Sequence, residues 1–173
     1  RVPVSLPTGN YPAYYAGCNF KTVMYDAEAL KSAWKKFMED FYEDMDMFMG
    51  PAFIFSGKVM DICDFKNYSW PGHGLGDDVN TFQFVEAQYM KGDEYDLMMK
   101  DPSDFGFRVL TPRTMGAAEG LKYFPPLSTF MGTPMVMTFP FTRKEVRDSF
   151  KKLIKAGEAM EKWQKELMVA MRE

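Results

Sequence analysis

The chain has 173 residues, of which 46% are hydrophobic and 26% charged, and its formal net charge is −3. This length and composition are those of one globular domain with a substantial core. The basic residues are scattered, which argues against a nucleic-acid-binding protein, because such a protein would carry a basic stripe. No apolar run approaches the roughly 18 residues of a membrane span. The start of the chain shows no signal-peptide pattern, so we expect a cytoplasmic protein with neither a membrane nor a nucleic-acid partner.

The first third of the chain predicts two strands and one helix. Residues 2–6 predict a short buried strand, and a loop rich in Gly, Pro and Tyr follows them. Asp26 is a candidate N-cap for an amphipathic helix. The apolar face of that helix recurs at helical spacing and comprises Leu30, Ala33, Trp34, Phe37, Met38 and Phe41. Residues 52–56 form an apolar run that ends at Gly57, which predicts a strand buried on both faces.

The middle of the chain has weaker patterns. Residues 58–65 predict either a short helix or a continuation of the preceding strand. Residues 66–81 predict a loop, because they contain Pro71 and three glycines. Residues 82–90 predict a strand, since β-favouring aromatic and branched residues begin this segment.

Helical patterns prevail after residue 90. Asp93 is a candidate cap for a helix that ends before Pro102, because the residue before a proline is pushed out of the helical region. Ser103 is the predicted start of the next helix, and a third helical segment covers residues 114–123. A short strand is predicted for residues 135–139.

The last element is predicted to be a long helix. Thr142 and Glu145 have the spacing of a capping box, in which each side chain satisfies an unpaired amide at the helix start. An apolar face then continues to the end of the chain. Short strands that alternate with amphipathic helices predict an α/β architecture.

Four motifs of the sequence carry a resemblance. They read RVPV…YPAYYAG, WPGHGL, FQFVEAQYMKGDEYDLMMKDPSDF and RTMGAAEGLKYFPPL. They resemble the uroporphyrinogen decarboxylase superfamily, and more narrowly its decarboxylase-like branch found with corrinoid methyltransferases in anaerobic microbes. The resemblance covers nearly the whole chain but matches only the N-terminal half of such a protein. It implies that residues 1–173 are a single domain, truncated at the C-terminus, that forms the N-terminal part of a (β/α)8 TIM-barrel-like fold with loop insertions.

Two departures from the decarboxylase pattern bear on the activity. The decarboxylases carry arginines in the loop after their first strand, which bind substrate carboxylates. Here that loop reads PTGNYPAYY, and Gly57 stands where the decarboxylases have an aspartate. The resemblance therefore implies methyl transfer to or from a corrinoid or thiol acceptor in the full-length protein. Two alternatives stay open, namely a decarboxylase of a tetrapyrrole or another carboxylic acid, and a non-catalytic half-barrel that self-associates.

The resemblance also implies cofactors and partners. Zinc and a corrinoid are implied for the full-length parent, together with a corrinoid protein and a small-molecule substrate as partners. In that branch one histidine and two cysteines hold the zinc, in the C-terminal half. Cys18, Cys63 and His73 are the right ligand types, but their spacing forms no motif, so we assign no metal or cofactor to this chain. Whether the protein is an enzyme stays open, and we expect residues 1–173 alone to be inactive and to form a homo-oligomer.

Five residues are candidates for substrate binding, and no catalytic residue is assigned. Asn10 and Tyr11 follow the first predicted strand, at the end where barrels place their chemistry, although they also suit a turn. His73 is the only histidine and lies between two glycines, where it is either a pocket acid–base group or an exposed loop residue. Glu86 and Tyr89 either face the pocket or brace the next helix.

Overall fold

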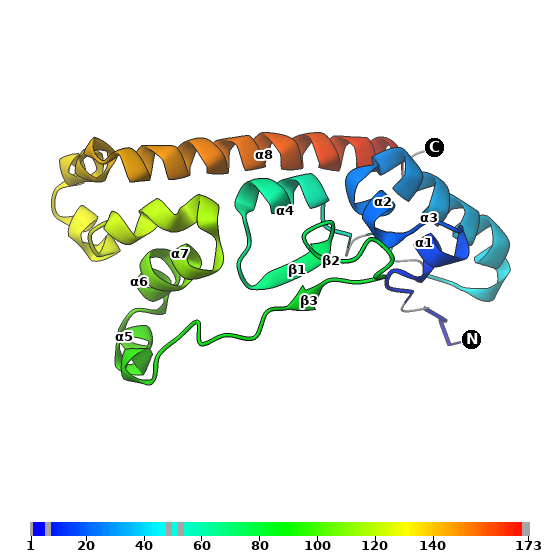
Figure 1. Ribbon diagram of the computed structural model, residues 1–173, viewed down its shortest axis with the longest axis horizontal. Helices are drawn as coiled ribbons and strands as arrows, with labels where there is room; N and C mark the ends of the chain where they lie inside the picture. The colour runs from blue at the N-terminus through cyan, green and yellow to red at the C-terminus, as the bar shows by residue number, and fades with distance from the viewer. Residues whose placement is uncertain (1, 6–7, 48–49, 52–53, 171–173) are drawn as a thin grey trace. The chain divides into compact units, whose positions relative to one another are not determined.

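The computed structural model describes residues 2–5, 8–47, 50–51 and 54–170. Helices make up most of the described residues, and a small three-stranded sheet accompanies them (Figure 1). The predicted α/β class is therefore correct at the level of helices combined with a sheet. Within the described ranges, no helix is both long enough and apolar enough to cross a membrane.

The chain divides into two compact units. The first unit comprises residues 1–60, 69–83 and 159–173, and the second comprises residues 61–68 and 84–158. The first unit holds α1 (Tyr11–Tyr15), α2 (Phe20–Tyr25), α3 (Ala27–Phe41) and η1 (Tyr42–Asp44). Two further helices, α4 (Gly57–Cys63) and α8 (Lys144–Ala170), have residues in both units.

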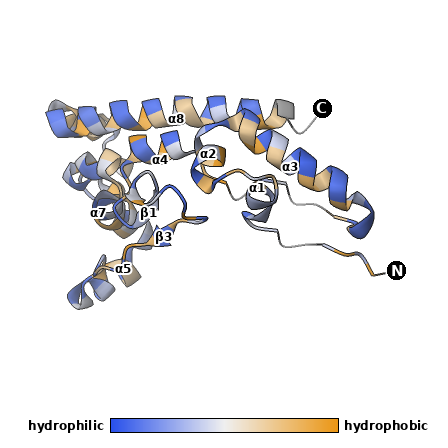
Figure 2. Cartoon of the chain, turned by 45° about the vertical axis from the view of Figure 1, so that its right-hand side comes forward, coloured by the Kyte–Doolittle hydropathy of each residue, from blue (hydrophilic) through white to orange (hydrophobic). Residues whose placement is uncertain are grey.

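Helix α3 begins where its sequence predicts. The Asp26 carboxylate accepts hydrogen bonds from the amides of Glu28 and Ala29, at 2.9 and 3.1 Å. These bonds satisfy donors that have no partner inside the first turn. The predicted apolar face is buried on one side of the helix, and Figure 2 shows apolar and polar residues alternating along α3. Its buried members are Leu30, Ala33, Trp34 and Phe37.

The sheet is short and its strands have the order β2-β1-β3. The strands are β1 (Tyr68–Pro71), β2 (Gly74–Leu75) and β3 (Gln83–Phe84). β1 and β2 pair in parallel, with Trp70 opposite Gly74. Two of these strands lie inside residues 66–81, which the sequence predicted as a loop. The turn between these strands requires its glycines, because Gly72 and Gly74 both have φ of +85°, which other residues rarely adopt.

The strands predicted for residues 2–6 and 52–56 are wrong over the residues that the structure describes, namely 2–5 and 54–56. Residues 2–5 contain one bridge, between Ser5 and Met47, and their valine side chains are exposed. Residues 54–56 form no strand and lead directly into α4, which agrees with the helical alternative for residues 58–65. Residue 6 and residues 52–53 lie outside the described residues.

The other two strand predictions also differ from the structure. In the 82–90 segment only Gln83 and Phe84 are β-strand. Residues 135–139 lie within η6 (Pro134–Thr142), a 3₁₀ helix. A strand needs a partner strand to satisfy its amides and carbonyls, and 3₁₀ turns satisfy them locally instead.

The second unit is a series of short helices. They are η2 (Gly92–Glu94), α5 (Tyr95–Lys100), α6 (Pro102–Phe105), the π-helical turn η3 (Gly106–Leu110), α7 (Thr111–Thr114), η4 (Gly116–Tyr123), η5 (Leu127–Met131) and η6. α5 ends before Asp101-Pro102, as predicted. The Asp101 carboxylate accepts the Asp104 amide and caps α6, a role that the sequence analysis gave to Ser103. At the start of η2 the Glu94 carboxylate accepts the Lys91 amide, and the predicted cap for this region was Asp93.

An aromatic core holds the second unit together. Its buried members are Ala118, Leu121, Phe124 and Val146, and the Phe124 ring lies 5.6–5.9 Å from the rings of Phe107, Phe141 and Phe150. η4 approaches α8 closely, because the Gly120 amide donates to the Ser149 hydroxyl at 2.8 Å. α8 starts at Lys144, one residue later than a cap at Thr142 predicts, and the Thr142 hydroxyl donates to the Phe139 carbonyl.

Candidate functional site

Two of the five predicted binding residues line one open hollow in the first unit. Asn10, Tyr11, Tyr14 and Asn80 surround this hollow, whose volume is about 330 Å³. Asn10 immediately precedes α1, and its Nδ2 donates to the Asn80 carbonyl at 3.0 Å. That bond joins two lining residues that are 70 positions apart in the sequence. We call this feature the tyrosine hollow.

Aromatic rings give the tyrosine hollow a firm wall. The centroid of the Tyr11 ring lies 6.1 Å from that of Tyr14 and 6.2 Å from that of Tyr15. The edge of the buried Phe37 ring meets Tyr11 from α3, with the two planes at 86°. Tilted and edge-on contacts of this kind are the favoured arrangements of aromatic pairs. The exposed faces of Tyr11 and Tyr14 are therefore held in position to contact a flat ligand.

The charges behind the tyrosine hollow are already paired. Asp40 accepts hydrogen bonds from Lys36 Nζ at 2.6 Å and from the Tyr15 hydroxyl at 2.9 Å. The Lys36 ammonium and the Tyr15 hydroxyl hold the pKa of Asp40 below its usual value, and the bond to Asp40 raises the pKa of Tyr15. None of the four lining residues is charged. The arrangement suits a small uncharged molecule better than a polyanion.

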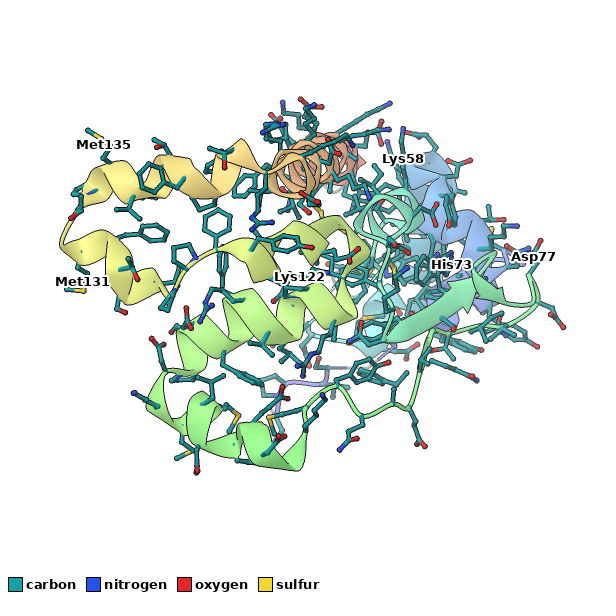
Figure 3. All side chains as sticks on the ribbon, turned by 60° about the vertical axis from the view of Figure 1, so that its left-hand side comes forward. Lys58, His73, Asp77, Lys122, Met131 and Met135 are labelled. Carbon is teal, nitrogen blue, oxygen red and sulfur yellow. The ribbon has the colours of Figure 1, made fainter. Side chains whose placement is uncertain are left out.

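His73 lies in the turn between β1 and β2. Its ring stacks on Trp70, with centroids 4.0 Å apart and planes at 6°, and Figure 3 labels its side chain. The backbone amides and carbonyls of Trp70 and His73 are joined by two hydrogen bonds, of 2.8 and 2.9 Å. His73 is exposed, whereas Trp70 is fully buried and donates its Nε1–H to the Tyr25 hydroxyl. The residues that line the tyrosine hollow do not include His73.

Glu86 and Tyr89 belong to the second unit. Glu86 is exposed, and Tyr89 is half-buried. The Tyr89 hydroxyl donates to the Val85 carbonyl at 2.6 Å, and the Tyr89 carbonyl accepts from Arg113 at 3.0 Å. These contacts fit the alternative in which Tyr89 braces the neighbouring helices.

Two acidic residues of the most specific motif are tied to arginines. The Arg113 guanidinium donates two hydrogen bonds to the Glu94 carboxylate, of 2.7 and 2.5 Å. With the Lys91 amide, it lowers the pKa of Glu94 to about 2. Arg108 makes a similar pair with the almost fully buried Asp104, and this pairing lowers the pKa of Asp104. Neither pair was predicted. Glu94 and Arg113 are 19 residues apart in the sequence, whereas Asp104 and Arg108 have the i,i+4 spacing of a helical ion pair, and this signal was not used.

A second hollow in the first unit, of about 390 Å³, carries charges of both signs. It is lined by Tyr25, Asp26, Ala27, Glu28, Ser56, Lys58, Ala159, Lys162, Trp163 and Glu166. Figure 3 labels Lys58 on this part of the chain. Lys162 lies 3.7 Å from Glu166, and the Asp26 carboxylate is used to cap α3. The sequence analysis missed this hollow because three distant segments form it. Its opposing charges offset one another, so we assign it no ligand.

In the part of the chain that the structure describes, Cys18, Cys63 and His73 do not form a zinc site. Among the described residues, no three His, Cys, Asp or Glu side chains come together in a way that could hold a metal ion. Cys18 is half-buried in the first unit, and Cys63 is buried at the end of α4. Burial raises the pKa of the Cys63 thiol, and this opposes formation of the thiolate that zinc requires.

At the level of class, this is an α/β protein, mainly helical, with an uncharged aromatic hollow on one unit. Comparison with family descriptions, with curated proteins and with solved structures gave no match to the chain.

Proposed function

We propose that the chain is part of a uroporphyrinogen decarboxylase-like protein of the methyltransferase branch. In this proposal residues 1–173 contribute the N-terminal part of a (β/α)8 barrel in a cytoplasmic enzyme. The parent protein transfers a methyl group to or from a corrinoid or thiol acceptor, with a corrinoid protein as its partner. The proposal rests on the family-like motifs of the sequence, because a shared fold alone does not define a reaction.

One structural observation supports the resemblance. Two of its motifs, at residues 82–105 and 113–127, are far apart in sequence but are joined by the Arg113–Glu94 pair and by the bond from the Leu127 amide to Asp104. Each motif therefore supplies the partner of a charged or polar group in the other. Motifs that depend on each other in this way are expected to occur together in a family.

The tyrosine hollow is the proposed binding site of the small-molecule substrate. Its rings can hold the face of a small methyl donor, and the Asn10 side chain is fixed beside them by its bond to Asn80. The contribution of these residues is to bind and orient the donor, because methyl transfer needs the acceptor in line with the bond that breaks. The zinc that the resemblance implies would need ligands other than Cys18, Cys63 and His73.

The same hollow argues against the decarboxylase alternative. Uroporphyrinogen carries many carboxylates, which proteins bind most effectively with arginine forks. The four described residues that line the tyrosine hollow include no arginine or lysine, and the nearby Lys36 is paired with Asp40. A substrate with several negative charges would therefore lose its hydration there without gaining a cation.

An anaerobic assay of the natural protein, isolated at its natural length, separates the alternatives. The protein is incubated with methylcobalamin and a thiol, and loss of the methyl–cobalt bond is followed by visible absorbance. In parallel, carbon dioxide release is measured with uroporphyrinogen. The proposal predicts spectral change without carbon dioxide release, whereas the reverse result would identify a decarboxylase. If neither occurs over a range of methyl donors and acceptors, the proposal is rejected.

A further inference from the structure

The second unit exposes four apolar side chains on η5 and η6. Met131 is 88% exposed and Met135 is 73% exposed, and Figure 3 shows both side chains extending away from the ribbon. Met137 and Phe139 are also exposed. Residues 123–142 contain no charged side chain. Exposed apolar patches of this kind mark interaction surfaces more often than scattered single residues do. We call these four residues the methionine patch.

The methionine patch has a firm base. Phe130 and Phe141, on the same two elements, pack edge-on against the buried Phe124, with ring centroids 6.3 and 5.7 Å apart. The Arg147 guanidinium also donates to the carbonyls of Phe141 and Thr142. Inward-facing aromatic residues thus fix the segment while the methionines face outward. Methionine side chains are flexible and polarisable, so they adapt to the surface of a partner.

The patch is flanked by positive charge. Residues 119–155 contain seven lysines and arginines and three acidic residues, for a local net charge of +4. Because the whole chain carries −3, its other residues carry −7. Arg143 and Lys144 follow the patch directly, and both are exposed. A partner for this surface should therefore present apolar groups among negative charges.

The first unit provides such a surface at the end of α3 and in η1. Glu39, Glu43 and Asp44 are exposed there, Asp40 is paired with Lys36, and no lysine or arginine occurs between residues 37 and 57. The Tyr42 side chain is exposed among them. We call residues 39–44 the acidic segment. It combines exposed carboxylates with an exposed aromatic ring, which is the complement of the methionine patch.

We propose that two copies of this chain associate head to tail, with the methionine patch of one copy on the acidic segment of the other. Pairing of two methionine patches is disfavoured, because Arg143 and Lys144 directly follow each patch and would bring like charges to the same interface. A contact between two different surfaces leaves one of each unused, so further copies can add or the chain of copies can close into a ring. This inference does not depend on the methyl-transfer proposal.

Sedimentation velocity of the full chain tests the association. The wild-type protein should form dimers and larger species as concentration rises, and salt should weaken them because the charges lie at the surface. Met131→Glu/Met135→Glu places acidic groups opposite the acidic segment and should weaken association on the order of ten-fold or more. Glu43→Lys/Asp44→Lys should have the same effect from the other side. All four positions are exposed, so the variants are expected to fold.

A mixing experiment identifies the head-to-tail arrangement. Each double variant keeps one surface intact, so a mixture of the two should form a one-to-one complex although neither self-associates. Met99→Glu and Glu158→Lys, at exposed positions outside both surfaces, should associate as the wild type does. A monomeric wild-type protein, a mixture that forms no complex, or equal weakening by the control variants would each overturn the proposal.

Discussion

Arg113 and Glu94 form a two-bond ion pair that joins α7 to the turn before α5. The guanidinium donates to both carboxylate oxygens of Glu94 and also to the carbonyl of Tyr89, at 3.0 Å. A planar guanidinium matches a carboxylate in a way that lysine cannot. Glu94, one of the three acidic residues of the DEYD motif, is thus bound within the second unit and is not available to a substrate.

Acid should weaken the second unit through Glu94. The pKa of Glu94 is about 2 in the folded chain, and its ordinary value is 4.5. Because the pKa of Glu94 is lower in the folded chain than in the unfolded chain, its ionised carboxylate stabilises the fold at pH values above about 4.5. This contribution is lost as pH falls from about 4.5 towards 2. Urea unfolding should show that Glu94→Gln lowers stability at neutral pH, and that the difference from wild type shrinks at pH 3. Glu86→Gln, at an exposed position, should match wild type at both pH values, and a constant Glu94→Gln deficit would contradict this account.

Asp104 should be among the most sensitive positions in the second unit. Its side chain is only 5% exposed, and it accepts bonds from Arg108 and from the Leu127 amide. Asp104→Ala leaves the arginine and the amide without this acceptor, so we expect a loss of about 3 kcal/mol in the free energy of unfolding. Asp148→Ala removes the exposed pair with Lys144 and should change the unfolding midpoint little. If Asp104→Ala and Asp148→Ala lowered the free energy of unfolding equally, the buried pair would be no more important to stability than the exposed one, and the prediction would be wrong.

Two glycine substitutions should have opposite effects. A Cβ at Gly120 would lie 2.4 Å from the Glu145 carbonyl oxygen, a backbone atom that cannot move independently. Gly120→Ala should therefore cost about 1–3 kcal/mol in thermal or urea unfolding. A Cβ at Gly157 meets nothing within 4 Å in the middle of α8, so Gly157→Ala should stabilise by about 0.5–1 kcal/mol. If Gly120→Ala were neutral, the close approach of η4 to α8 would be wrong.

The tyrosine hollow predicts a difference between two exposed tyrosines. Tyr14→Ala removes half of the aromatic wall and should raise the KM of the methyl donor about ten-fold, with unfolding unchanged. Tyr42→Ala, an equally drastic change at an exposed position outside the hollow, should leave KM unchanged. Equal kinetics for Tyr14→Ala and wild type would exclude the hollow as the binding site.

Local signals in the sequence predicted where several helices lie, although of the four predicted caps only Asp26 acts as predicted. The Asp26 cap and the apolar spacing of α3 depend on residues within a few turns of one another, and both are present in the structure. Strands were predicted poorly because their stability depends on a distant partner. Residues 135–139 have strand-like composition but lie in η6, where local turns satisfy the backbone and Met135, Met137 and Phe139 stay exposed.

The residues of the tyrosine hollow could also be predicted only where they are close to one another in the sequence. Asn10 and Tyr11 could be predicted from their place after the first apolar segment. Asn80 could not, because its contact with Asn10 bridges 70 residues. Tyr14 follows Tyr11 by one helical turn, so the helical spacing in YPAYY was the signal that could have identified it.

The central claim is methyl transfer, and isotope transfer tests it most directly. The natural protein is incubated anaerobically with methylcobalamin carrying a trideuterated methyl group, together with a thiol, and the thiol is analysed by mass spectrometry. The account predicts a thioether that carries the labelled methyl group, formed only when the protein is present. A thiol that stays unlabelled would contradict the account, and carbon dioxide release in a parallel incubation with uroporphyrinogen would then identify a decarboxylase.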